Sequence, residues 1–402
     1  MRVAVVAEWY PSPADPVHGI WAHRQAVAAR DAGAEVRVLA MRRPVPPLAA
    51  LRALAAGPPN PGPLRRWAAG LPSTLRPWRL DGIEVWPVPF LSPPRPRSYG
   101  SWGHWMAPPL GVALDRLRRR WPFDLVHAHS IVPPGYAAFR WRRRPGRPPL
   151  VVSAHGPDMI HVPRRSGLAR RASRSALHGS DLVVANSAWA EARCREIAGA
   201  EIASTVVHLG TDLPAEPPAR RERPTIVSVA HLVARKRHSV VLHALAELSP
   251  GLRPDYLVIG DGPGRRPLER LAAELGLAER VRFAGQLEHE RALAEARRCH
   301  LFVMPGVEEP FGVAFVEAMA AGLPAIGAAG EGGPEEIAAA GGGMLLVPPD
   351  DHMALARAIE RGIGGEAAEL GFAARENVAR NFTWERCGSA TLAAYESVLG
   401  RS

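Results

Sequence analysis

The sequence predicts an α/β protein with two tandem Rossmann-like domains, whose parallel sheets face each other across a cleft. Short apolar strands alternate with amphipathic helices along the chain, a pattern typical of parallel sheets that helices cover on both faces. The alternation stops at a polar, proline-rich segment over 211–224 and then restarts. At 402 residues, the chain is also too long for one ordinary hydrophobic core.

The first repeat begins with an apolar strand over 3–7, a helix over 19–31 and a second strand over 35–40. The stretch of about 42–105 is rich in proline, arginine and tryptophan, and we expect an irregular insert there with one strand over 84–88. The remaining expected elements of this half are a helix over 110–120 and strands over 124–127, 150–153, 181–185 and 205–208.

The second repeat follows the same pattern after the linker. Its expected strands span 225–229, 255–259, 280–283, 300–303, 324–327 and 343–347. We therefore predict an N-terminal Rossmann-like domain over 1–212, a C-terminal Rossmann-like domain over 213–383, and a last helix over 384–402 that packs back on the first domain. Open parallel sheets bind ligands at the carboxyl ends of their strands, so we expect the site there.

The charge is unevenly distributed. Residues 1–215 carry a net charge of +15 and residues 216–402 a net charge of −4, and nine of the 11 tryptophans lie in the first 150 residues. Arginine beside tryptophan suits an anionic membrane surface or a polyanionic acceptor. A solvated arginine-rich surface explains the same composition, and both interpretations stay open. No nucleic-acid-binding motif accompanies the charge, so we expect no nucleic acid partner.

Targeting signals and cysteines indicate a cytoplasmic protein, associated with the inner face of a membrane if the basic half binds there. The first ten residues do not resemble a signal peptide, because they are short and soon acidic. The apolar stretch 313–330 is broken by Glu317 and Pro324. The three cysteines are far apart in sequence, so we expect buried apolar fillers in a reducing compartment.

Lys236 is the only lysine, since every other basic residue is arginine. It follows the expected strand 225–229 and precedes a helix. An ammonium is a compact point charge and a guanidinium is a broad planar fork, so a narrow phosphate site can accept the first and exclude the second. Survival of one lysine by chance is the alternative explanation.

A second phosphate-site signal lies at 309–324, where Glu-Pro-Phe-Gly-Val-Ala-Phe-Val-Glu follows a strand and opens a helix near Gly312. The free amides of Gly312, Val313 and Ala314 lie at the positive end of the helix dipole, an arrangement that binds phosphate. Glu309 and Glu317 can flank the same group, which favours a ligand with hydroxyls. Favourable acids near a helix N-terminus explain Glu309 equally, and Glu317 less well.

These residues resemble family 4 of the retaining glycosyltransferases with the GT-B fold. Glu309 through Glu317 matches its Glu-x7-Glu motif. The segments His-Leu-Val-Ala-Arg-Lys-Arg-His, Ile-Gly-Asp-Gly-Pro and Gly-Gly-Pro-Glu-Glu-Ile resemble its donor loops, and three histidine-containing segments resemble its acceptor-side loops, at 18–26, 126–129 and 153–158. The resemblance covers nearly the whole chain except about 42–105.

The resemblance implies donor contacts for Lys236 with the diphosphate, Glu317 with the ribose and Glu309 with the transferred sugar. His231 stands where the family usually has arginine, and Arg235 is a candidate to compensate. Further implied donor-binding residues are Gly19, Gly262, Phe311, Gly312, Val313 and Ala314.

On the acceptor side, His155 is the best catalytic candidate, because it follows the strand 150–153 beside Gly156. We expect only one of His127 and His129 to face the site, and we choose His129. His18 and Gln25 are further acceptor-side candidates from the resemblance. The histidine spacing matches no zinc signature and no Asp-x-Asp motif is present, so we expect neither a metal nor another cofactor.

The predicted function is transfer of a sugar from a nucleotide diphosphate sugar to a hydroxyl of a glycan, glycolipid or lipid-linked acceptor in cell-surface polysaccharide or glycoconjugate biosynthesis. Retention of the anomeric configuration is implied by the resemblance. Two alternatives stay open: a nucleotide-sugar epimerase or phosphorylase on the same fold, and a non-catalytic nucleotide-sugar binding protein. Donor and acceptor identity and the oligomeric state are beyond the sequence.

Overall fold

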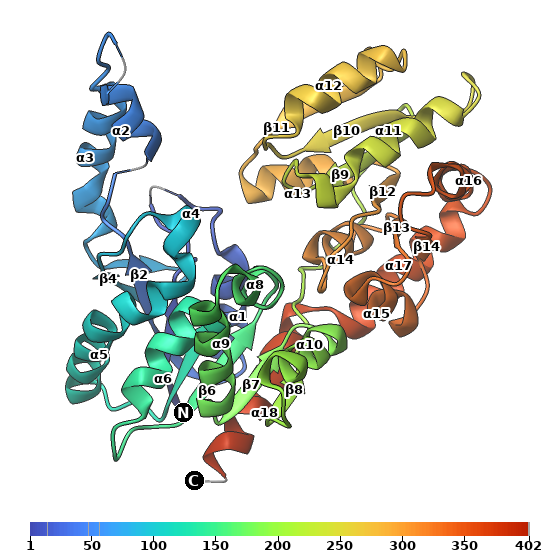
Figure 1. The fold of residues 1–402 in the computed structure, drawn as a ribbon. Coiled ribbons are helices and arrows are strands. Elements are labelled where there is room, and N and C mark those ends of the chain that lie inside the picture. The colour runs from blue at the N-terminus through green and yellow to red at the C-terminus, as the bar shows by residue number, and fades with distance from the viewer. Residues whose placement is uncertain (14, 47, 56, 401–402) are drawn as a thin grey trace. The chain divides into compact units, whose positions relative to one another are not determined.

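The chain folds into two compact units in a computed structural model that describes all residues except 14, 47, 56 and 401–402 (Figure 1). Unit 1 comprises Met1–Asn186, Ala190–Val207 and Cys387–Ser402, and unit 2 comprises Ser187–Trp189 and His208–Arg386. The division between them therefore falls after Val207 instead of after residue 212. The last helix, α18, starts in unit 2 and runs on into unit 1.

Unit 1 is built on an eight-stranded sheet with the order β3-β4-β2-β1-β5-β6-β7-β8. Every neighbouring pair is parallel except β3 and β4, which form an antiparallel hairpin at one edge. The strands are β1 (Arg2–Ala7), β2 (Glu35–Arg42), β3 (Trp78–Leu80), β4 (Ile83–Pro89), β5 (Leu125–His129), β6 (Leu150–Ala154), β7 (Leu182–Ala185) and β8 (Ser204–Val206).

The helices of unit 1 cover this sheet in two groups. Helix α1 packs closely against α18, because a Cβ on Gly388 would lie 2.2 Å from the carbonyl oxygen of Ala28. Helix α6 contacts both α5 and α9, and these three helices cover the strands β2, β4 and β6. The helices are α1 (Ile20–Asp31), α2 (Leu48–Ala55), α3 (Gly62–Thr74), α4 (Arg95–Ser98), α5 (Trp102–Arg120), α6 (Tyr136–Arg142), α7 (Pro157–Ile160), α8 (Val162–Arg165), α9 (Gly167–Gly179), α10 (Ala188–Ala198) and α18 (Trp384–Leu399).

The prediction of an irregular insert over about 42–105 is wrong. Helices α2 and α3, the hairpin β3-β4, helix α4 and the first turn of α5 occupy this stretch. Leu48–Ala55 is rich in alanine and leucine, the strongest helix formers, and the proline at the start of α3 occupies a position that needs no amide donor. Helix α5 runs through Pro108 and Pro109, because Trp102, Met106 and Leu110 bury its inner face.

Unit 2 is built on a six-stranded, fully parallel sheet with the order β11-β10-β9-β12-β13-β14. Its strands are β9 (Thr225–Val229), β10 (Asp255–Ile259), β11 (Val281–Gly285), β12 (Leu301–Met304), β13 (Ala325–Ala328) and β14 (Met344–Val347). Its helices are a 3-10 turn (Ala234–Lys236), α11 (His238–Glu247), α12 (Arg265–Glu274), α13 (His289–Arg297), α14 (Val313–Met319), α15 (Gly332–Ala340), α16 (His352–Ile363) and α17 (Ala367–Asn381).

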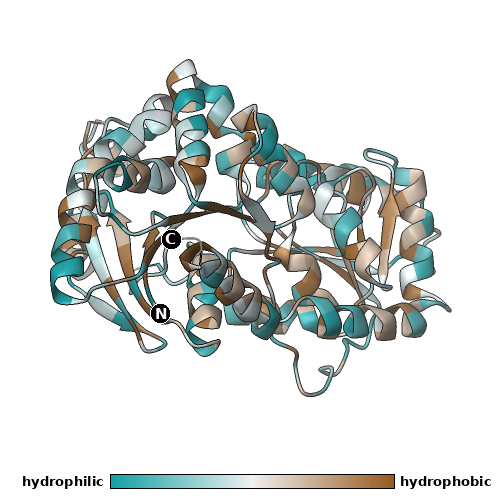
Figure 2. Cartoon of the chain, turned by 90° about the horizontal axis from the view of Figure 1, so that it is seen from below, coloured by the Kyte–Doolittle hydropathy of each residue, from teal (hydrophilic) through white to brown (hydrophobic). Residues whose placement is uncertain are grey.

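The core of unit 2 lies between the sheet and helices α11, α12 and α16, where Leu242, Leu268 and Ile359 pack against Val258 and Ile326. Helices α13 and α14 contact the strands β9, β10, β12 and β13. Figure 2 shows the strands of both sheets as mainly hydrophobic, with hydrophilic residues along the helices. Each aliphatic side chain that is fully buried in this way stabilises the fold by about 1.5–3 kcal/mol.

The observed strands confirm the predicted fold class of two parallel α/β units. The three cysteines are free thiols and buried, as predicted. No helix among the described residues is long and apolar enough to cross a membrane.

Candidate functional site

The strand order of the sheet places the candidate site of unit 2 at its centre. The order reverses between β9 and β12, which are hydrogen-bonded neighbours with Ile226 opposite Leu301. Loops that leave two such strands at their carboxyl ends diverge and open a crevice between them. The loop after β9 carries Lys236, and the loop after β12 carries Glu309.

Backbone contacts hold these two loops together. The amide of Val307 donates to the carbonyl of Arg235 at 2.8 Å, and the guanidinium of Arg235 donates to the carbonyl of Glu308 at 3.3 Å. Gly306 allows this approach, because a Cβ there would lie 3.1 Å from the Arg235 carbonyl oxygen. The backbone of Lys236 is therefore held in place by contacts that do not involve its own side chain.

The turn after β10 supports the same loop from the other side. Gly262 follows β10, and a Cβ on it would lie 2.6 Å from the carbonyl oxygen of Leu232. Gly264 donates from its amide to that carbonyl at 2.9 Å. The amide of Gly262 donates to the carboxylate of Asp261 at 2.7 Å. Gly262 thus supports the loop after β9 by packing closely against its backbone.

Lys236 and Glu309 form a buried ion pair, with each residue only 8% exposed. The ammonium of Lys236 donates to Glu309 Oε2, and the sulfur of Met304 lies 3.5 Å from the same nitrogen. The guanidinium of Arg235 lies 3.8 Å from the same carboxylate oxygen. Two cations therefore meet one carboxylate at the end of β12.

Gly312 connects this pair to helix α14. Its φ of +84° is left-handed, and a Cβ would lie 2.6 Å from the ring of Phe315 and 3.3 Å from Glu309 Cγ, so glycine is required. Val313 and Ala314 begin the helix, and the first amides of a helix have no partner within it. In the structure Glu309 therefore contacts both Lys236 and Gly312.

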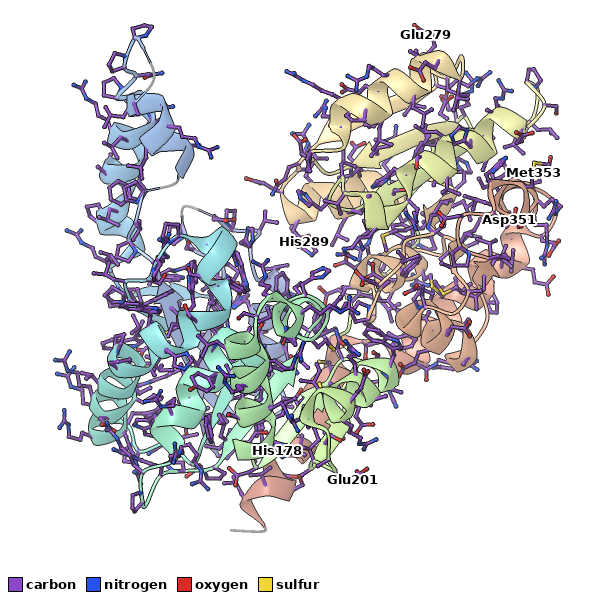
Figure 3. All side chains as sticks on the ribbon, viewed as in Figure 1. His178, Glu201, Glu279, His289, Asp351 and Met353 are labelled. Carbon is purple, nitrogen blue, oxygen red and sulfur yellow. The ribbon has the colours of Figure 1, made fainter. Side chains whose placement is uncertain are left out.

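Three of the other donor-side candidates lie in different surroundings. Glu317 is the second acid of the motif, and its carboxylate lies 3.5 Å from Nε2 of His289, the first residue of α13 and labelled in Figure 3. His231 is exposed on the loop after β9. Phe311 is 1% exposed and packs against the rings of His208 and Phe382, so its side chain belongs to the core and is not available to a ligand.

Sequence reasoning missed Glu331, whose carboxylate accepts a hydrogen bond from the amide of Glu309 at 3.2 Å. Burial raises the pKa of Glu331, and its hydrogen bonds to the amides of Glu309 and Glu308 oppose that shift. Gly333, two residues later, approaches so closely that a Cβ would lie 2.1 Å from the Phe311 carbonyl oxygen. The available signal was its place directly before the Gly-Gly-Pro-Glu-Glu-Ile segment, because Glu331 precedes two glycines that open α15.

In unit 1 the strand order reverses between β1 and β5, and the loop after β1 ends at Gly19. Gly19 has a φ of +82°, and a Cβ there would lie 2.2 Å from the carbonyl carbon and oxygen of Trp9. His18 stacks on the ring of Trp9 with centroids 4.5 Å apart, and its Nδ1 lies 3.3 Å from the Asp15 carboxylate. Gly19 thus closes this loop by packing against its own backbone.

Three histidines adjoin one another at the ends of β5 and β6. Nδ1 of His129 lies 2.9 Å from Nε2 of His155, and the His127 and His129 rings are 4.4 Å apart. His127 and His129 point to the same side of the sheet, because they are two residues apart on β5. His127 is fully enclosed, since Tyr395 and Ser153 hydrogen-bond both of its nitrogens at 2.7 Å.

Burial keeps these rings neutral. It lowers the pKa of His155 to about 4 and that of His127 to about 3, and it lowers the pKa of His129 in the same direction. His129 Nε2 and His155 Nδ1 are buried polar atoms with no protein partner among the described residues. The hydrogen bond between His129 Nδ1 and His155 Nε2 contains one proton, which one ring donates to the other. The tautomer of one ring therefore fixes that of the other.

Asp158 is a second residue that sequence reasoning missed. One oxygen of its carboxylate accepts hydrogen bonds from the amides of His155 and Gly156 at 3.2 and 2.8 Å, and the other accepts from the amide of Ile131 at 2.9 Å. This one side chain therefore fixes the backbone of the loops after β5 and β6. Its place in Ala-His-Gly-Pro-Asp, three residues after His155, was the available signal.

Gln25 does not face a surface, which corrects its expected role on the acceptor side. Its side chain is 1% exposed and donates to the hydroxyl of Thr391 on α18 at 3.3 Å. The helical face that carries Gln25 is the one that α18 covers, a contact over 366 positions of sequence.

Two families of known proteins match this chain in sequence. The family described as "Glycosyltransferase Family 4" matches residues 19–214, and "Glycosyl transferases group 1" matches residues 211–377. A 2-deoxystreptamine glucosyltransferase of Streptomyces kanamyceticus is 30% identical over 331 residues, which cover 74% of this chain and 83% of that protein. A GDP-mannose-dependent alpha-(1-6)-phosphatidylinositol monomannoside mannosyltransferase of Mycolicibacterium smegmatis is 28% identical over 277 residues, covering 61% and 70%.

Solved structures share the fold. Sucrose-phosphate synthase from Thermosynechococcus elongatus superposes with a TM-score of 0.78 at 22% identity and covers 100% of both chains. Anabaena HepE in complex with UDP superposes with a TM-score of 0.70 at 19% identity, covering 99% of this chain and 100% of that one. At these identities the likeness concerns the fold and not the ligands.

Proposed function

Because this chain is a glycosyltransferase of family 4 with the GT-B fold, we propose that it transfers a sugar from a nucleotide diphosphate sugar to a hydroxyl, with retention of the anomeric configuration. The observation that carries the proposal is the buried Lys236–Glu309 pair at the strand-order reversal of unit 2. A cation fixed beside a carboxylate matches a ligand that presents phosphate next to sugar hydroxyls.

On the donor side, Lys236 binds the diphosphate and Glu309 accepts hydrogen bonds from hydroxyls of the transferred sugar. An ammonium has three N–H donors, so contact with Glu309 leaves donors for phosphoryl oxygens. Arg235, 3.8 Å from Glu309, takes over the countercharge of that carboxylate when Lys236 turns to the phosphate. The charge on the leaving nucleoside diphosphate grows as the sugar–oxygen bond breaks, so the attraction to Lys236 is strongest in the transition state.

Glu317 and His231 complete the donor site at its margins. Glu317 is assigned to the ribose hydroxyls, with His289 orienting its carboxylate at 3.5 Å. His231 lies exposed on the same loop as Lys236 and can donate one hydrogen bond to a phosphate. The amides of Gly312 to Ala314 add donors without added charge.

On the acceptor side, His155 is the residue that we assign to the reacting hydroxyl and sugar. Its low pKa keeps it neutral at physiological pH, so it acts through hydrogen bonding and not as a cation. His129 sets its tautomer, and Asp158 fixes its backbone. In the retaining reaction we propose, the acceptor proton passes to the leaving phosphate oxygen as the new sugar–oxygen bond forms.

The acceptor class follows from the charge of the N-terminal half, with +15 over residues 1–215. We assign acceptors that are anionic or held at a membrane surface, in cell-surface polysaccharide or glycoconjugate biosynthesis in the cytoplasm. The cations of the donor site supply the countercharge for the leaving group, so we expect transfer to need neither a metal nor another cofactor.

The test is a panel of UDP-, GDP- and ADP-sugars measured by thermal shift, followed by product analysis with the stabilising donor. A bound donor raises the melting temperature by mass action. We expect one nucleotide to stabilise the protein, and NMR of the product to show a retained anomeric centre after addition of chelator. Donor conversion without an acceptor identifies an epimerase, dependence on free phosphate a phosphorylase, and binding without turnover a sensor; each result contradicts the proposal.

A further inference from the structure

A cluster of arginine and aromatic side chains lies at the carboxyl edge of the unit 1 sheet, outside the histidine site. Its members follow β1 and β2 or come from the stretch that the sequence suggested to be irregular. We call it the Arg95 cluster, and it consists of Glu8, Trp9, Arg43, Arg95, Tyr99 and Trp102.

Arg95 is held in place by aromatic rings. The carbon of its guanidinium lies 4.2 Å from the centre of the Trp9 ring, 4.5 Å from that of Tyr99 and 5.6 Å from that of Trp102. Stacking of this kind fixes the plane of a guanidinium and leaves its N–H edges for hydrogen bonds. The Arg95 side chain is nevertheless 43% exposed, so solvent reaches it.

The charge of the cluster is not balanced. The carboxylate of Glu8 lies 3.5 Å from Arg95 and accepts a hydrogen bond from the hydroxyl of Tyr99 at 2.7 Å. Burial raises the pKa of Glu8 to about 7, although Arg95 and Tyr99 oppose that shift. Arg43 lies over Trp102 at 5.0 Å, and burial together with the charge of Arg95 lowers its pKa. The cluster thus holds two guanidinium groups, and its one carboxyl group, paired with Arg95, is weakly ionised.

We propose that Arg95 is the anion-binding residue of the acceptor site, and that its guanidinium edge binds a phosphate or carboxylate group on an acidic sugar acceptor. This inference rests on the proposed function, because it assigns the acceptor to unit 1. An arginine fixed by stacking binds an oxyanion with little loss of side-chain entropy, and its planar fork matches two oxygens of one phosphate.

A purely structural role for Arg95 is the competing explanation, in which it ties α4 to the end of β1. The two roles differ in what Glu8 does. In a structural tie, Glu8 is the partner that Arg95 needs. In an anion site, Glu8 is a competitor that weakens binding of the acceptor group. Replacement of Glu8 by glutamine keeps an acceptor for the Tyr99 hydroxyl and removes the competing charge.

The experiment measures binding of glucose 6-phosphate, glucose and inorganic sulfate to the full chain by calorimetry. The variant Arg95→Gln keeps a planar polar side chain, Arg95→Ala removes it, and Arg119→Ala, at an exposed position near the end of α5, is the matched control. We expect glucose 6-phosphate to bind more tightly than glucose, and Arg95→Gln to weaken the phosphate at least tenfold while Arg119→Ala binds like the wild type. Binding of glucose 6-phosphate by Arg95→Gln and Arg95→Ala like the wild type, or an equal loss in the control, overturns the inference.

Glu8→Gln supplies the second measurement. Sulfate keeps its charge between pH 6 and 8, so a change in its affinity reports on the protein. The groups that act on Glu8 are Arg95 and Tyr99. The other titratable groups nearby contact the rings of the cluster: His18 stacks on Trp9, Arg43 lies over Trp102 and Arg165 lies over Tyr99. We expect wild-type affinity to fall as pH rises through about 7 and Glu8→Gln to bind more tightly with a smaller pH slope. Weaker sulfate binding by Glu8→Gln contradicts the inference and supports the structural tie.

These outcomes separate the inference from the proposed function. If glucose 6-phosphate binds through Arg95 but no nucleotide sugar is turned over, the proposed function fails and the anion site stands. If sugar transfer is observed and Arg95→Gln binds glucose 6-phosphate like the wild type, the inference alone fails.

Discussion

Replacement of Lys236 by methionine tests how much the only ammonium side chain contributes. Methionine has a similar length and no charge, so it fills the space beside Met304 without a new polar group. The change removes the ammonium that donates to the Glu309 carboxylate. Glu309 is only 8% exposed, and its remaining cation is Arg235 at 3.8 Å.

Two effects of different size follow from this geometry. An ammonium and a phosphoryl charge about 4 Å apart interact by about 4 kcal/mol at an effective dielectric of about 20, before desolvation. If about 2.7 kcal/mol of that is expressed in the transition state, turnover falls about 100-fold. Removal of one partner from a buried ion pair destabilises the fold by about 3–5 kcal/mol, and Arg235 keeps the cost near the lower value.

Stability and turnover are separated by a second variant. Lys236→Met combined with Glu309→Gln removes both charges, and we expect it to recover part of the lost unfolding free energy in a urea titration. Sugar transfer stays low in both variants, because the recovered stability does not restore the phosphate contact. Arg282→Met, which removes an exposed cation on β11, is the control and keeps wild-type turnover.

The assay is initial-rate transfer, or donor hydrolysis where no acceptor is known, at a temperature where each variant is folded by circular dichroism. Turnover by Lys236→Met within threefold of the wild type would refute the reasoning, whatever its stability. A loss in Arg282→Met of the same size would show that general charge and not the site controls the rate.

Three further predictions concern the scaffold of the site. Gly19→Ala should lower the unfolding free energy by at least about 1–3 kcal/mol in urea, because a Cβ would lie 2.2 Å from the Trp9 carbonyl at a φ of +82°, whereas Gly70→Ala within α3 should raise it slightly. Asp158→Asn should cost about 2–3 kcal/mol, because an amide nitrogen must face one of three backbone N–H donors, and Asp31→Asn at an exposed position should not. The free energy of unfolding should fall as pH decreases from about 6.5 to 4, because His155, with a folded pKa of about 4, stays neutral in the folded protein while the unfolded chain takes up the proton. The measurement is the melting temperature against pH. We expect a smaller slope for His155→Asn than for the wild type, and an unchanged slope contradicts the prediction.

Apart from β3, each strand that the structure describes was predicted from sequence to within two residues of its observed bounds. The strand 225–229 and the strand 255–259 were predicted at their observed bounds, because a buried parallel strand is a continuous apolar run between turn residues. Prolines misled the prediction of the stretch 42–105 and of the start of α5. A proline opens α3, and two more are tolerated inside α5 because tertiary packing of Trp102 and Met106 outweighs their local cost.

The candidate residues could be chosen from sequence, but the contacts among them could not. Lys236 and Glu309 were assigned separate partners, and backbone contacts between their loops, such as the hydrogen bond between Val307 and Arg235, explain why the two side chains meet. Gln25 was misplaced because the helix that covers it is 366 positions away in sequence. These contacts are non-local, and no period or motif within one segment records them.

The most direct measurement is the structure of the protein with the nucleoside diphosphate that stabilises it most in the thermal panel. We predict a phosphoryl oxygen about 2.7–3.2 Å from Nζ of Lys236, with the ribose beside Glu317. A diphosphate bound elsewhere in the protein, with Lys236 still paired only to Glu309, would contradict the account.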